Sequence, residues 1–168
     1  MEPIDLSLTE RLILANQFQI LAALKPSEAD DYNHLVEIAK RGFALEYPSF
    51  FTDFDREGLT REQCEYVRDV LDMFWNLQDS YDQLANKGTL KESDVIFPGF
   101  DGNNENSLLQ YAKLQLQHGF QEFRHKAGLN SHFPTAHEYP AMLKRYEAVP
   151  IERRRQLSAD EMRKILGR

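Results

Sequence analysis

The 168-residue sequence predicts an all-α protein, an irregular helical domain of about six helices. Three observations support this fold class. Apolar residues recur at spacings of three and four along most of the chain, which is the period of an amphipathic helix. At three places a Ser or Thr precedes a Glu or Gln by three positions, as in a helix-capping box. No series of segments shows the alternating apolar and polar residues typical of a β-sheet.

The first two predicted helices lie at the start of the chain. The first occupies SLTERLILANQFQILAAL, where Ser7 and Glu10 have capping-box spacing, and Lys25-Pro26 ends it because proline does not continue a helix. The second begins near Ser27, with acidic residues in its first turn and basic residues in its last, as the helix dipole favours. Gly42 is its expected C-terminal stop.

The third predicted helix is the longest. Thr60 and Gln63 form a second capping box, and the pattern continues to about Asn86-Lys87-Gly88. Its apolar residues recur at spacings of three, four and seven, and they are Cys64, Val67, Leu71, Phe74 and Tyr81. The stripe indicates a helix with one face in the core.

Three shorter helices are predicted in the rest of the chain. Asn103 or Asn104 is the expected N-cap of ENSLLQYAKLQLQ. A later helix runs through AMLKRYEAV, and its regular part starts near Pro140. Ser158 and Glu161 form the third capping box, at the start of SADEMRKIL.

Length and composition limit the organisation and the location of the protein. With 42% hydrophobic residues, the chain can bury a sizeable core as one domain over 1–168, within which 1–42 would be a helical-hairpin subdomain. No apolar run approaches the length of about 20 residues that spans a bilayer, so no membrane contact is expected. MEPIDLSLTE lacks the basic start of a secretory signal, and Cys64 has no second cysteine to pair with. Both features favour the reducing cytoplasm.

Charge is distributed unevenly along the chain, whose net charge is −7. Residues 1–139 hold 12 Lys and Arg against 23 Asp and Glu, whereas residues 140–168 hold 8 against 4. An acidic body repels phosphate backbones and disfavours nucleic acid as a partner. The basic end, with Arg153, Arg154 and Arg155, leaves a nucleic-acid-associated regulator as one alternative.

Four sequence blocks carry a family resemblance. They are ERLILANQFQIL near the start, RGFALEY after the second helix, VIFPGFDGNNE in the middle and LSADEMRKIL at the end. In this order and spacing the chain resembles the YfbU-like family over essentially its whole length. The resemblance implies an all-helical bacterial protein of unestablished molecular function, with no agreed catalytic residues to carry over.

The segment VIFPGFDGNNE predicts a short extended connector near residues 95–100. Its first residues favour β structure, Pro98-Gly99 forces a turn, and the apolar side chains are expected to seal the core. Alternatively, Gly99, Asp101 and Gly102 would line a ligand pocket, because glycine lets a ligand approach backbone amides. The segment lacks the spacing of known phosphate-binding loops.

An aromatic segment broken by Pro48 follows the second helix, and it is predicted to be a hydrophobic crossover or short helices. Its aromatic residues are Phe43, Tyr47, Phe50, Phe51 and Phe54. They complete a core in the ordinary case, since each aromatic buries a large apolar area. Exposed together, they would form a subunit interface.

Three sequence patterns resemble catalytic or metal sites. His118, Glu122 and His125 are spaced by four and three, so they would share one helix face as weak candidates for a metal site. DFDREGLTREQC resembles a calcium loop but holds Cys64 where the bidentate Glu belongs. Cys64 stands between Glu62 and Glu65, which would raise rather than lower a thiol pKa. No cofactor is therefore expected.

These observations favour a cytoplasmic helical protein that binds protein, with a homo-oligomer as the expected assembly. The aromatic residues near 43–54 are numerous for a small core and account for that expectation. A small hydrolase, with a metal held by His118, Glu122 and His125, is the alternative. The sequence does not decide whether the protein is an enzyme.

Overall fold

The computed structural model describes residues 4–52, 54, 58–119 and 129–168. Its described part is all-α, as predicted, with an isolated parallel bridge between Phe100 and Asn130 and no strand. The chain divides into two compact units, Met1–Glu57 and Gly58–Arg168, called here the N-terminal and C-terminal units. No described helix is both long enough and apolar enough to cross a membrane.

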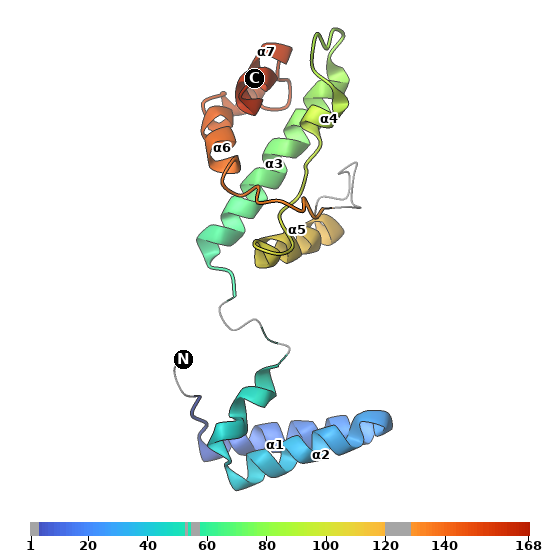
Figure 1. Ribbon diagram of the computed structural model, residues 1–168, viewed down its shortest axis with the longest axis vertical. Helices are drawn as coiled ribbons and strands as arrows, with labels where there is room; N and C mark the ends of the chain where they lie inside the picture. Colours follow the sequence, from blue (N-terminus) through green and yellow to red (C-terminus); the bar gives the residue numbers. More distant parts are fainter. Residues whose placement is uncertain (1–3, 53, 55–57, 120–128) are drawn as a thin grey trace. The chain divides into compact units, whose positions relative to one another are not determined.

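The N-terminal unit is a helical hairpin followed by a short helix (Figure 1). Its elements are α1 (Leu8–Leu24), the 3-10 helix η1 (Pro26–Glu28), α2 (Ala29–Arg41) and the 3-10 helix η2 (Ala44–Phe51). The predicted capping box is present, since the Glu10 amide donates to Ser7 Oγ and the Ser7 amide donates to the Glu10 carboxylate. Gly42 ends α2 in the left-handed conformation at φ 71°, also as predicted.

The C-terminal unit is built around one long helix, α3 (Arg61–Gln83), with α4, α5 and α6 packed against it and α7 packed on α6 (Figure 1). The remaining elements are α4 (Glu92–Val95), α5 (Asn106–His118), α6 (Tyr139–Glu147), the 3-10 helix η3 (Ile151–Arg153) and α7 (Ala159–Leu166). The capping boxes predicted for α3 and α7 are both present.

A continuous hydrophobic core fills the C-terminal unit. Twenty-three buried apolar residues form one cluster, which includes the predicted α3 stripe from Val67 to Tyr81. Four aromatic rings meet at its centre; they are Phe74, Phe97, Phe100 and Tyr139, with centroids 5.3–6.0 Å apart in the contacting pairs. Phe97 and Phe100 come from VIFPGF, so this segment does seal the core.

Three predicted boundaries are wrong. Helix α3 ends at Gln83, before the predicted end at about Asn86-Lys87-Gly88. Val95 closes the short helix α4, so the extended connector begins at Ile96. Neither Asn103 nor Asn104 caps α5, whose preceding residue is Glu105. The reason is a competing turn, in which Asp101 accepts hydrogen bonds from the Asn103 amide and the Asn104 side chain.

Candidate functional site

The two units differ sharply in how many of their apolar residues are buried. Within the described residues, the N-terminal unit buries only Ala15, Val36, Ile38, Ala39 and Tyr47, whereas the C-terminal unit buries the 23 of its core cluster. Yet eight of the eleven large hydrophobic side chains that are exposed among the described residues belong to the N-terminal unit. Contiguous exposed apolar area of this kind is uncommon on monomeric soluble proteins.

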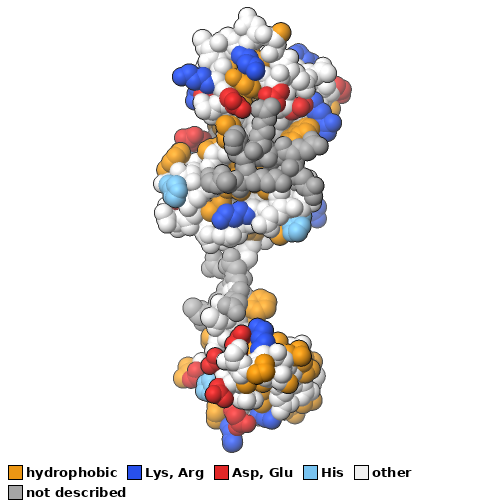
Figure 2. Space-filling model, turned by 90° about the vertical axis from the view of Figure 1, so that its right-hand side faces the viewer, with side chains coloured by type: hydrophobic (Ala, Val, Ile, Leu, Met, Phe, Trp, Pro, Cys, Tyr) orange, Lys and Arg blue, Asp and Glu red, His pale blue; other side chains and the backbone are white. Residues whose placement is uncertain are grey.

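Most of this exposed area comes from α1. Leu8, Leu12, Ile20 and Leu24 are 73%, 60%, 59% and 73% exposed, and Ile13 is 51% exposed. Between Leu12 and Leu24 the helix carries no charged residue on any face. In Figure 2 hydrophobic side chains gather on the lower body, which is the N-terminal unit. The outer side of α1 is therefore an uncharged apolar face, called here the α1 outer face.

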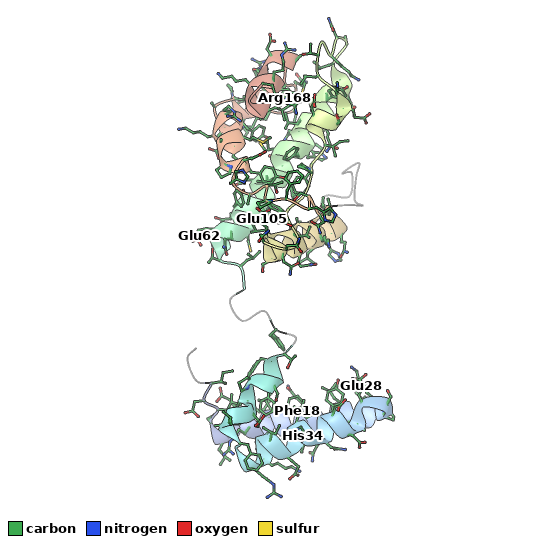
Figure 3. The ribbon with its side chains drawn as sticks, viewed as in Figure 1. Phe18, Glu28, His34, Glu62, Glu105 and Arg168 are labelled. Atoms are coloured by element: carbon green, nitrogen blue, oxygen red, sulfur yellow. The ribbon has the colours of Figure 1, made fainter. Side chains whose placement is uncertain are left out.

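The opposite side of α1 holds the hairpin together. Ala15 is buried there, and Leu14 and Phe18 are half-buried. The Phe18 ring packs on Phe50 of η2 with centroids 5.3 Å apart, and Figure 3 labels Phe18 at this position on α1. Because α1 carries apolar residues on both sides, one side packs within the unit while the other stays exposed.

The structure separates the predicted aromatic interface into inner and outer residues. Tyr47 is buried and stacks on Phe50, which is half-buried together with Phe51. Phe43 and Phe54 are exposed. The segment therefore supplies part of the small core of the N-terminal unit, and only its two end residues add to the exposed apolar area.

The connector after Phe97 is tied to a second loop in the C-terminal unit. The Phe100 amide donates to the Leu129 carbonyl at 3.1 Å, and the Ser131 amide donates to the Phe100 carbonyl at 3.2 Å. Gly99 has φ 99°, and a Cβ built on it would overlap the carbonyl of Leu129. A Cβ on Gly102 would likewise meet the Asn130 side chain. The lack of a side chain at these glycines allows the two loops to approach each other closely.

Glu105 joins the same two loops at the start of α5 (Figure 3). Its carboxylate accepts hydrogen bonds from the amides of Asp101 at 2.9 Å, Thr135 at 3.0 Å and Ala136 at 2.9 Å, and from the Thr135 hydroxyl at 3.2 Å. Burial raises the pKa of Glu105, but the hydrogen bonds from these three residues outweigh it, so the net pKa lies below its ordinary value of 4.5.

Other buried polar groups around the connector are satisfied in the same way. The hydroxyls of Thr135 and Tyr139 both donate to the Gly99 carbonyl, at 2.8 Å and 2.6 Å. Hydrogen bonds to Asp101, from the Asn103 amide first and then the Asn104 side chain, lower its pKa. The backbone groups of Gly99, Asp101 and Gly102 thus take part in hydrogen bonds within the connector and with the second loop.

The arginines of the basic end make contacts within the C-terminal unit. Arg153 pairs with Glu161 at 2.9 Å, Arg154 donates to the Val149 and Glu147 carbonyls, and Arg155 lies over the Trp75 ring. Arg168 pairs with Asp94 near the end of the chain, where Figure 3 labels it. Arg153 and Arg168 are thus paired with acids of the same unit, although both stay exposed, and these ion pairs lower the net positive charge that would attract a nucleic acid.

The predicted metal site is only partly within the described residues. His118 is the last residue of α5 and is exposed, whereas Glu122 and His125 lie outside the described residues. The calcium-like pattern also falls largely outside them, at Asp53, Asp55 and Glu57. Among the residues that are described, no group of three or more His, Cys, Asp or Glu is arranged to hold a metal ion.

The surface of α3 carries an open hollow, which is lined by Glu65, Arg68, Asp69 and Asp72. Burial, followed by the nearby charges of Glu147, Asp72 and Glu65, raises the pKa of Asp69. All four lining residues are exposed. The hollow is a charged surface without a buried acid and base in contact, so it does not resemble a catalytic cleft.

The α1 outer face was not predicted, although the sequence indicates it. LILANQFQILAAL contains thirteen residues without a charge, yet a helix on the surface of a protein normally has a charged side. An apolar pattern on both sides of a short helix predicts that both sides are covered. The aromatic segment at 43–54 indicated an exposed apolar surface more strongly than α1 did, because its side chains are larger.

The chain is similar to known proteins along almost its full length. The YfbU domain pattern matches residues 4–167. The UPF0304 protein of Mannheimia succiniciproducens is 33% identical over 166 residues, which cover 97% of this chain and 99% of the relative. UPF0304 proteins of Actinobacillus succinogenes and Histophilus somni are 32% and 33% identical over the same shares. These matches confirm the resemblance seen in the four sequence blocks.

Proposed function

The chain belongs to the YfbU family, and we propose that this bacterial protein works by binding protein through the apolar surface of its N-terminal unit. The observation that carries the proposal is the imbalance within that unit. In its described part, this unit buries five apolar residues and exposes eight large ones. A helical unit of this size gains most of its stability from apolar burial. A partner that covers α1 would therefore add the buried apolar area that the hairpin lacks.

The C-terminal unit serves as the rigid part of the protein in this proposal. Its core is complete, its connector is closed by hydrogen bonds, and its arginines are engaged internally. These properties favour a stable body that carries a binding unit. The location proposed for the protein is the reducing cytoplasm, where the lone, half-buried Cys64 would persist as a thiol.

Photo-crosslinking in living bacterial cells tests the proposal. A photoreactive amino acid replaces Leu12 on the α1 outer face, and in a matched variant it replaces Lys144, which is exposed on α6 of the C-terminal unit. Protein adducts are expected from position 12 in clear excess over position 144. If position 12 gives no protein adduct while the variant accumulates in folded form, the proposal is wrong.

A further inference from the structure

We draw no further inference here: the strongest candidate, the hollow on α3 lined by Glu65, Arg68, Asp69 and Asp72, is an exposed acidic cluster, and no second feature of the described residues around it points to a ligand.

Discussion

At the scale of the residue, Glu105 shows how one side chain determines the path of two loops. Apart from the single bridge of Phe100 and Asn130, the segments 99–105 and 129–136 have no regular secondary structure that pairs their amides. The Glu105 carboxylate accepts from the backbone on both segments, and the Thr135 and Tyr139 hydroxyls bind the same connector at Gly99. Charge-assisted hydrogen bonds are roughly twice as strong as neutral ones. The Glu105 carboxylate therefore holds the two segments together by pairing backbone amides that a β-sheet would otherwise pair.

Replacing Glu105 with glutamine is expected to lower the free energy of unfolding of the C-terminal unit by about 2–3 kcal/mol. The amide nitrogen of glutamine would face backbone N–H donors that now meet a carboxylate oxygen. Urea titration followed by circular dichroism measures the loss. The control is Gln110→Glu, an exposed change on α5 that is expected to alter stability by less than about 0.5 kcal/mol.

The effect of Glu105 depends on pH in a direction fixed by its lowered pKa. A carboxylate whose folded-state pKa lies below the ordinary 4.5 stabilises the fold fully above 4.5 and loses this contribution as pH falls through the lower folded-state value. The stability difference between the unaltered protein and Glu105→Gln should therefore be constant at neutral pH and shrink below pH 4.5. A difference that grows in acid would contradict this role of the carboxylate.

Gly99 is the residue at which a single methyl group matters most. Alanine there would take φ 99° and place its Cβ on the Leu129 carbonyl, so Gly99→Ala is expected to cost at least about 3 kcal/mol in the C-terminal unit. Gly58→Ala is the matched control, since Gly58 also has positive φ but an open space around its Cβ. That variant is expected to lose no more than about 1 kcal/mol, and equal losses in thermal unfolding would refute the role of Leu129.

At the scale of the element, α3 and α1 illustrate two outcomes of an apolar pattern. One side of α3 is polar and the other is buried against several elements of its own unit, so its pattern is satisfied within the chain. Helix α1 is apolar on both sides, and the structure covers only the side that faces α2 and η2. The apolar pattern of a helix thus predicts how much of its surface must be buried, but the tertiary fold determines which residues bury it.

Ser80 connects α3 to the segment before α7. Its Oγ accepts a hydrogen bond from the Leu157 amide at 3.0 Å, in a buried position. Ser80→Ala leaves this amide without a partner and is expected to cost about 1–2 kcal/mol, seen as faster hydrogen exchange in α7. Gln117→Ala, exposed on α5, is the control, and an unchanged exchange rate in α7 for Ser80→Ala would contradict the proposed link.

At the scale of the whole molecule, the two units differ in how much apolar surface they bury on folding. The C-terminal unit has one continuous core, and the N-terminal unit has a few small buried residues and one buried tyrosine. A short helical hairpin with so little buried area is marginal in water. Its stability is therefore expected to depend on what covers α1, whereas that of the C-terminal unit is not.

Separate expression of the two units tests this difference. Residues 58–168 alone are expected to unfold cooperatively in urea at a midpoint that does not change with protein concentration. Residues 1–57 alone are expected to gain helix content and thermal stability as their concentration rises, because association stabilises the folded form. Concentration-independent, cooperative unfolding of residues 1–57 would show that the hairpin needs no partner.

The sequence by itself determined the helices of this protein and much of their ends. Periodicity and capping spacing located α1, α2, α3, α5, α6 and α7, and the boxes at Ser7, Thr60 and Ser158 are present as predicted. These signals are local, since a cap joins residues three positions apart. The cap of α5 was misplaced, because a turn around Asp101 competes for the same backbone groups. The short helix α4 was also missed, since four residues are too few to show a helical period.

The tertiary structure alone decided which surfaces remain open. In the folded chain, Leu129, Thr135 and Tyr139 contact the connector at Gly99. These residues lie 30 or more positions away in the sequence, and no local pattern links them to Gly99. The tertiary structure also covered one side of α1 and left the other exposed. Local spacing fixes where a backbone can coil, but burial depends on contacts between distant residues, and the uncovered face of α1 follows from those contacts.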